Sequence, residues 1–323
     1  MKKRMLILLL VCVLLLTSCT ATLPLGGSTA TNVPGVSLRL PEAQAPATLD
    51  TRETATLFFR YQEEPFLAPE TRIITTSPSR AYEMTLLTAL LAGPGSHSTE
   101  LKTLFPAGTR VLSTVTQGRT LFVTLSKEIL SAYPDDSSVS ASEQLMRRQL
   151  CMQSIVATIT ENCDIDRVQI LVEQTGASSG SLRLQESYFL EDPASTQLVG
   201  PMTRDDSLIL TPARTVELIC SLWKSRDWQR LYQYVALRDP STSAERVSYR
   251  DFVTAMENLP LLSGYTLSGG SVTLDGGQAT YTLDATTLQG GRETIHQGRI
   301  LRLCRENSLW RVTLPQLTGW LEE

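Results

Sequence analysis

The chain contains only two histidines, His97 and His296, which limits the chemistry open to it. A metal site, a Ser-His-Asp centre or a Cys-His centre would need one of them beside further ligands or a nucleophile. His97 follows Gly93-Pro94 in a predicted loop, and His296 lies far along the chain in a predicted strand. Neither neighbourhood contains a GxSxG elbow or a cysteine nucleophile motif. The sequence therefore predicts no catalytic residue, no metal site and no cofactor, and we expect a protein that is not an enzyme.

Acidic pairs and glycine pairs have equally simple explanations. Asp135-Asp136 and Asp205-Asp206 lie in polar loops without the alternating oxygen-ligand spacing of a calcium loop, so solvated turns are expected. The glycine pairs at 269–270, 276–277 and 290–291 are expected between strands and precede no helix, which is typical of hairpins and not of phosphate-binding loops.

Four of the six cysteines fall in the part of the chain that we expect to fold. Cys151 and Cys163 lie on one predicted helix, about 18 Å apart at 1.5 Å per residue, which is too far for a disulfide. Cys220 and Cys304 fall on a predicted helix and a predicted strand of one domain. A bridge between them is geometrically possible, and two small buried apolar side chains are the commoner alternative.

Residues 1–18 have the pattern of an export signal that ends before a cysteine. A basic Met1-Lys2-Lys3-Arg4 start precedes an apolar run, residues 5–16, that is too short to span a bilayer stably. The sequence Leu16-Thr17-Ser18-Cys19 resembles the bacterial lipobox. This resemblance implies that the Cys19 thiol receives a diacylglycerol and becomes the first residue of the mature chain. The alternatives are an ordinary secretory signal with an incidental Cys19, or an uncleaved anchor helix.

The charge of the mature chain disfavours polyanionic partners. Removal of residues 1–18 leaves 26 of the 29 basic side chains against 33 acidic ones, a formal charge of −7. That sign argues against nucleic acid and against electrostatic attachment to anionic lipid. Membrane contact is therefore expected only through the N-terminal lipid, with the protein on the extracytoplasmic face of the cell membrane.

Residues 19–52, rich in Thr, Ala, Pro, Gly and Ser, predict a disordered tether. After it, strands are expected at 54–61 and 67–76, and a helix with Ser79 as a plausible cap at about 82–91. A hairpin at 111–125, a long helix at about 140–162 and a strand at 168–172 follow. This order predicts an α+β domain, residues 53–190, with helices packed on a small sheet.

Several separated motifs in this region resemble the GerMN domain. They are Leu67-Ala68-Pro69-Glu70-Thr71-Arg72, Leu90-Leu91-Ala92-Gly93-Pro94, Phe105-Pro106-Ala107-Gly108-Thr109-Arg110-Val111-Leu112, Val123-Thr124-Leu125-Ser126-Lys127-Glu128 and Val168-Gln169-Ile170-Leu171-Val172. The resemblance implies an envelope protein of Gram-positive bacteria that is linked to sporulation or germination.

A linker, residues 191–210, and a second α+β domain, residues 211–323, are expected next. Thr211-Pro212 opens a helix that breaks near Arg226-Asp227, a shorter helix covers 248–258, and four strands follow at 265–274, 279–288, 294–304 and 309–314. This order resembles the NTF2-like cone. In that fold Asp251 and Asp284 are conceivable pocket residues, to which the sequence assigns no role.

The leading functional hypothesis is a lipid-anchored protein that acts through association with envelope or sporulation proteins, including possible self-association. Sheet edges or apolar patches would make the contacts, and the 54–61 strand is one candidate if it lies at an edge. The alternative is a ligand-binding lipoprotein whose C-terminal cone holds a small apolar or envelope-derived molecule. Acid/base catalysis in that cone is a third and weaker alternative.

Overall fold

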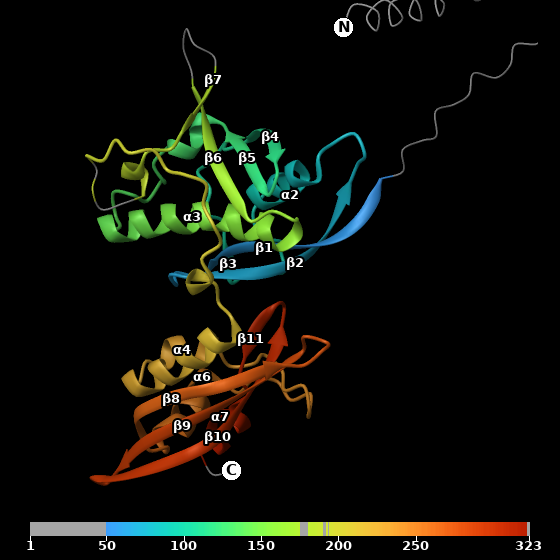
Figure 1. The fold of residues 1–323 in the computed structure, drawn as a ribbon. Helices are drawn as coiled ribbons and strands as arrows, with labels where there is room; N and C mark the ends of the chain where they lie inside the picture. Colours follow the sequence, from blue (N-terminus) through green and yellow to red (C-terminus); the bar gives the residue numbers. More distant parts are fainter. Residues whose placement is uncertain (1–49, 175–179, 190–191, 193, 322–323) are drawn as a thin grey trace, which may run out of the picture. The chain divides into compact units, whose positions relative to one another are not determined.

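Two small sheets enclose a long helix in the first half of the chain (Figure 1). A computed structural model describes residues 50–174, 180–189, 192 and 194–321. The predicted signal, Cys19 and nearly all of the predicted tether lie outside these residues. The sequence had predicted a single sheet, and the division into two sheets gives the long helix an apolar surface on both sides.

The first sheet is a long hairpin with a short third strand, in the order β2-β1-β3. β1 (Thr51–Tyr61) and β2 (Leu67–Thr76) pair antiparallel from Thr51 opposite Thr76 to Arg60 opposite Leu67. β3 (Leu101–Lys102) pairs only with the end of β1. Helix α2 (Tyr82–Leu91) follows the hairpin. Its N-cap is Ala81, not the predicted Ser79, whose hydroxyl instead lies 3.0 Å from that of Ser77.

The second sheet has the order β4-β5-β6-β7. β4 (Val111–Gln117) and β5 (Thr120–Leu125) form the predicted hairpin, with Gly118 in the left-handed region at φ 59°. β6 (Arg167–Gln174) pairs parallel to β5, which requires a long crossover because parallel neighbours cannot be joined by a tight turn. Helix α3 (Ala141–Asn162), capped by Ser140, provides that crossover. The short strand β7 (Gly180–Arg183) completes the sheet.

Helix α3 also closes the free edge of β1. The Phe58 amide donates to Thr158 Oγ1 at 3.2 Å, and Ser154 Oγ donates to the Phe58 carbonyl at 2.6 Å. Asn162 exchanges two hydrogen bonds with the backbone of Thr56 in the same way. Residues four apart on a helix share one face, so this polar stripe meets alternate residues of the strand. The 54–61 strand is therefore not an open edge. It was a candidate for partner contact only if it lay at an edge, so that hypothesis does not hold.

Residues 199–202 lie against the second sheet. Val168 and Met202 exchange backbone hydrogen bonds of 2.9 and 2.8 Å, and the Val199 amide donates to the Leu184 carbonyl. The Gln153 side chain on α3 binds the backbone of Thr203 and Asp205. Two 3-10 turns, η2 (Glu186–Tyr188) and η3 (Asp206–Leu208), lie between β7 and residue 210. Residues 197–205 thus add buried hydrogen bonds to the first domain, where a linker was expected.

The second half of the chain packs short helices on a four-stranded antiparallel sheet, in the order β11-β10-β9-β8 (Figure 1). The elements are α4 (Pro212–Ser225), α5 (Trp228–Gln233), α6 (Tyr249–Glu257), β8 (Leu261–Val272), β9 (Gln278–Gln289), β10 (Arg292–Glu306), β11 (Leu309–Arg311) and α7 (Leu314–Gly319). Thr211, Asp227, Ser248 and Thr313 cap the four helices by accepting from the third helical amide. The predicted break is confirmed, because Arg226 is left-handed at φ 55° and Asp227 starts α5.

The end of the chain differs from the sequence prediction. The last strand was expected to reach residue 314, but β11 ends at Arg311 and Thr313 caps α7. Trp320 follows that helix and packs against Trp223 of α4, with ring centroids 6.1 Å apart at 79°. Both tryptophans and Phe252 are buried.

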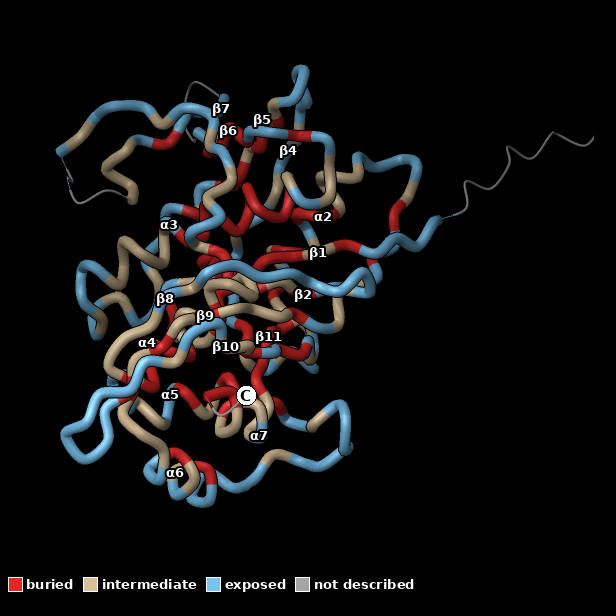
Figure 2. Tube along the Cα trace, turned by 60° about the horizontal axis from the view of Figure 1, so that its bottom comes forward, coloured by how far each residue is buried: buried red, intermediate tan, exposed pale blue. Residues whose placement is uncertain are grey.

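Buried residues gather along α2, α3 and β1 in the first half of the chain (Figure 2). The cysteines contribute to the interior of both halves. Cys151, Cys163, Cys220 and Cys304 are all free thiols, so the disulfide considered for Cys220 and Cys304 is not formed. Burial raises the pKa of Cys220 to about 12 and that of Cys304 to about 11, which disfavours a reactive thiolate.

Candidate association site

The residues that the sequence singled out for chemistry are not brought together. His97 lies in the loop after α2, and His296 on β10 lies 2.9 Å from Thr287 Oγ1 through its Nε2. Asp251 accepts from Ser248 Oγ in the cap of α6, and Asp284 accepts from the Gly298 amide. Within the described ranges, no three His, Cys, Asp or Glu side chains are grouped as metal ligands would be.

The acidic pairs serve the local structures that contain them. Asp135 pairs with Arg147 at 2.7 Å, and that hydrogen bond holds the pKa of Asp135 below its usual value. Asp136 accepts from the Tyr133 amide. Asp205 caps η3, and Asp206 pairs with Arg204. These are turn and cap interactions, as expected from the loops in which the pairs lie.

The most apolar opening in the first domain lies beside β7, and we call it the leucine groove. It has a volume of about 540 Å³. Its lining residues are Leu130, Val172, Glu173, Leu182, Arg183, Leu184, Gln185, Ser187, Tyr188 and Leu198. Leu182 is 54% exposed, Leu130 49% and Leu198 45%. Three large aliphatic side chains that remain half exposed around one cavity form a surface on which a partner would exclude water.

Strand register explains why Leu182 borders the groove. It stands opposite the buried Val172 in the β6–β7 ladder, so both side chains point to the same face of the sheet. β7 is the last strand of the sheet, and its continuation pairs with residues 197–199 only from Leu184 onward. The outer edge of Gly180–Arg183 therefore presents backbone N–H and C=O groups beside the apolar side chains.

The wall of the groove is held in place by Tyr188. Its hydroxyl donates to the Ile129 carbonyl at 2.9 Å, and burial raises its pKa. The Arg148 guanidinium lies 5.2 Å from the ring centroid and donates to the Tyr188 carbonyl at 3.1 Å. Because these contacts fix the ring before any partner binds, the groove is preformed, which reduces the entropy lost on association.

Glu173 and Arg183 place one negative and one positive charge on the rim of the groove. Neither side chain forms an ion pair with another residue in the described part of the chain. β7 was not among the predicted strands, although Ser181-Leu182-Arg183-Leu184 has the period of two that could have indicated a strand.

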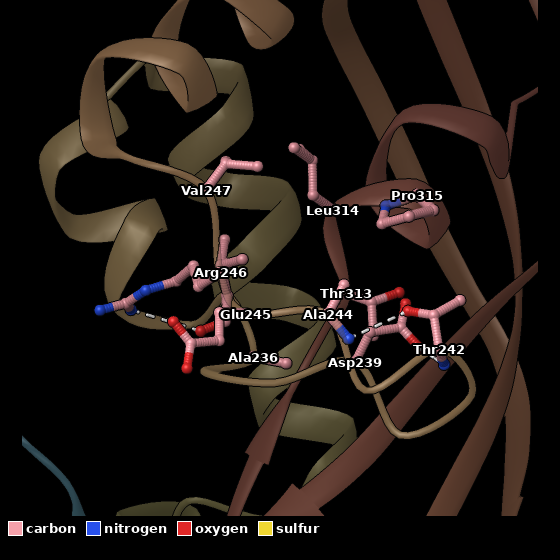
Figure 3. A pocket seen from close by; sticks show the side chains of 11 residues that line it. Ala236, Asp239, Thr242, Ala244, Glu245, Arg246, Val247, Thr313, Leu314 and Pro315 are labelled. Atoms are coloured by element: carbon pink, nitrogen blue, oxygen red, sulfur yellow. Dashed lines mark hydrogen bonds between the residues drawn. The ribbon is translucent and has the colours of Figure 1, made fainter.

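A smaller cavity of about 180 Å³ lies in the second domain (Figure 3). The side chains of Val247 and Leu314 point toward each other across it, and Asp239 and Thr242 lie on its polar side (Figure 3). Asp239 accepts hydrogen bonds from the Ser241 hydroxyl and from the Ser241 and Thr242 amides, and these hold its pKa below the usual value. Arg246 donates to the carbonyls of Tyr232, in α5, and of Val235. The polar groups of this cavity thus stabilise its walls.

The arrangement of the first half of the chain defines an α+β sandwich domain with an apolar groove at one sheet edge. Residues 56–176 match the family described as "Germane: Sporulation and spore germination". This part of the chain is a GerMN-type domain. Across the described ranges, no helix has the length and apolar character needed to cross a bilayer.

Solved structures similar to part of the chain include a protein named "Putative Lipoprotein from Clostridium perfringens". It is 21% identical, with 49% of this chain and 89% of that chain covered and a TM-score of 0.27. The tandem GerMN domains of the sporulation protein GerM from Bacillus subtilis are 17% identical, with 48% of each chain covered and a TM-score of 0.32. The first GerMN domain of that protein is 17% identical, with 47% of this chain and 98% of that chain covered and a TM-score of 0.31. The match thus spans about half of the tandem structure. No curated protein matches the chain.

Proposed function

We propose that this protein is a lipid-anchored, non-catalytic association module on the extracytoplasmic face of the cell membrane. The acylated thiol of Cys19 holds it there, and the GerMN domain binds an extended segment of an envelope or sporulation protein. The observation that carries the proposal is the leucine groove at the open edge of β7, which combines exposed apolar side chains with free backbone groups. An added strand would gain affinity from the backbone and specificity from the side-chain cavity.

The rim charges support an extended segment as the occupant. Arg183 follows Leu182 on the edge strand β7, so a strand laid along β7 would meet an apolar position on one face of the sheet and a basic one on the other, the face that also carries Glu173 of β6. Apolar side chains of that segment would pack on Leu182 and Leu198. Truncation or charge reversal at such a centre usually removes most of the binding free energy, because few residues carry most of it.

The experiment compares the wild-type chain with Leu182→Arg in sporulating cells of the source organism. Cross-linked complexes are recovered on the tagged chain, and the size of the delipidated protein is measured by analytical ultracentrifugation. Leu182→Arg is expected to lower recovery of the wild-type complex by more than about tenfold. The matched control is Leu112→Arg, which places the same charge on the other edge strand, β4, at a leucine that is 40% exposed.

Loss of the complex in Leu182→Arg and its retention in Leu112→Arg would support the groove as the contact site. Equal recovery from both variants would overturn that assignment. A wild-type chain that is strictly monomeric and recovers no envelope partner would overturn the association function itself.

A further inference from the structure

Charged and aromatic side chains are buried where the GerMN domain contacts residues 211–321, and we call this region the seam. Residues 48–323 form one compact unit, so these contacts lie inside it. The GerMN side contributes Tyr61 and Glu64 near the β1–β2 turn and Glu100 before β3. The other side contributes Arg230 of α5 and Arg311 of β11.

Arg311 is the most buried charge of the seam, with an exposed fraction of 1%. Its Nη2 pairs with Glu100 Oε2 of the GerMN domain, and its Nη1 donates to the Gln233 carbonyl. Its Nε lies 3.3 Å from Glu306 Oε2 on β10. A buried guanidinium is tolerated only where its charge and donors are matched. Arg311 obtains one of its two carboxylates from the other domain.

A second arginine–carboxylate pair crosses the seam. Arg230 binds Glu64 in a bidentate manner, with Nε to Oε1 at 2.8 Å and Nη2 to Oε2 at 2.6 Å. Glu64 is 6% exposed, whereas the Arg230 side chain is 46% exposed. The carboxylate is thus desolvated inside the contact and depends on the arginine of the other domain for compensation.

Apolar and backbone contacts continue the seam between these pairs. The rings of Tyr61 and Tyr234 are 5.7 Å apart, and both side chains are buried. The Leu210 amide donates to the Leu67 carbonyl at 2.7 Å, which joins the entry of α4 to the edge of β2. Further along that edge, the Thr71 amide donates to Ser308 Oγ at 3.3 Å.

We propose that the seam locks the GerMN domain and residues 211–321 into one cooperative body, and that Glu64–Arg230 and Glu100–Arg311 are the clamps that couple them. Each pair joins a carboxylate of the GerMN domain to an arginine of residues 211–321, so its loss removes a contact between the two halves and none within either half. The protein would then present both halves to a partner in one fixed arrangement. This arrangement is independent of whether the leucine groove binds a partner.

Two buried thiols and the tryptophans make the coupling measurable. Cys151 on α3 reports unfolding of the GerMN domain, and Cys220 on α4 reports unfolding of the second domain; both are fully buried. All four tryptophans, at 223, 228, 310 and 320, lie in the second domain. The mature chain carrying Cys19→Ser is exposed to graded urea and pulse-alkylated, and labelling of each cysteine is quantified by peptide mass spectrometry.

In the wild type, Cys151 labelling, Cys220 labelling and tryptophan fluorescence are expected to change in one coincident transition. In the double variant Glu64→Gln, Glu100→Gln, both labelling curves should move to lower urea and separate, so that below the wild-type midpoint the unfolded-to-folded ratios reported by the two cysteines differ by more than about tenfold. The control is Asp164→Asn with Asp166→Asn, which removes two exposed partners of Arg119 within the GerMN domain. It should leave the transitions coincident.

Separate transitions in the wild type would overturn the proposal of one cooperative body. Coincident transitions in the double variant would overturn the role of the two ion pairs. If the double variant does not fold, Glu64→Gln alone is used, because the half-exposed Arg230 can regain water. The two labelling curves of that variant should still separate, by less than in the double variant. If they do not separate, the role of the Glu64–Arg230 pair is overturned.

Discussion

Gly270→Ala is expected to destabilise the second domain because the Tyr281 ring occupies the position of a side chain at Gly270. The two residues are register partners in the β8–β9 ladder. A Cβ at Gly270 would lie 2.3 Å from Cδ1, 2.4 Å from Cε1 and 2.6 Å from Cγ of Tyr281. The ring therefore lies flat across the glycine, which supplies the room that a cross-strand aromatic side chain needs.

The position of Tyr281 Cγ sets the size of the effect. Rotation of the ring about its own axis leaves Cγ in place, so it cannot relieve the contact. Tyr281 must change χ1 or the two strands must move apart, and such forced shifts usually cost about 1–3 kcal/mol. We expect Gly270→Ala to lower the free energy of unfolding by an amount in that range.

Urea unfolding followed by tryptophan fluorescence measures this effect, because all four tryptophans lie in the second domain. Gly264→Ala is the matched control on the same strand, since its added Cβ would meet Thr286 Cβ at 3.8 Å, an ordinary van der Waals distance. It should change the free energy of unfolding by less than about 1 kcal/mol. A change toward higher stability also fits, because alanine reduces the conformational entropy of the unfolded chain.

The double variant Gly270→Ala, Tyr281→Ala isolates the clash. Removal of the ring should make the alanine at 270 nearly neutral, so the two substitutions must show a coupling energy of about 1 kcal/mol or more. Additive effects, or a Gly270→Ala variant as stable as Gly264→Ala, would refute the steric reasoning.

Two further predictions concern the closed edge of β1 and the membrane anchor. Thr158→Val leaves the buried Phe58 amide without its acceptor and should cost about 1–3 kcal/mol in urea unfolding, whereas Thr160→Val removes only a hydrogen bond within α3. Equal effects of the two valines would contradict the role assigned to Thr158. Cys19→Ser should abolish incorporation of radiolabelled fatty acid and move the chain from the detergent phase to the aqueous phase, whereas Cys12→Ser should not. Continued labelling of the Cys19→Ser chain would contradict acylation at that position.

Local patterns in the sequence predicted most of the elements. Thr211, Asp227 and Ser248 stand where helices were expected to begin, and the hairpin at 111–125 was placed correctly. The glycine pair at 269–270 was wrongly expected in a hairpin turn, since it lies inside β8. The correctly placed features depend on residues close in sequence, such as a cap hydroxyl and an amide three residues later. The α+β class followed from their order, and the GerMN-type domain from motifs within them.

Long-range contacts were beyond that reasoning. Ser154, Thr158 and Asn162 look like ordinary polar residues of a helix, and only the docking of α3 on β1 turns them into partners of a strand backbone. Likewise, Glu100 and Arg311 are far apart in the sequence and meet across the seam. The leucine groove was missed for the same reason, because Leu130, Leu182 and Leu198 come from three separate segments.

The sheet edges of the GerMN domain determine where another chain could be added. α3 closes the free edge of β1, and β2 combines Pro69, which has no N–H, with contacts from Leu210 and Ser308. The second sheet ends at β4 and β7. The apolar side chains of β4 stand exposed on the strand itself, whereas β7 borders the leucine groove. The seam covers β2 and leaves β7 free. Substitutions in the seam should therefore change the coupled unfolding without preventing partner binding. Leu182→Arg should instead prevent partner binding and leave the coupled unfolding unchanged.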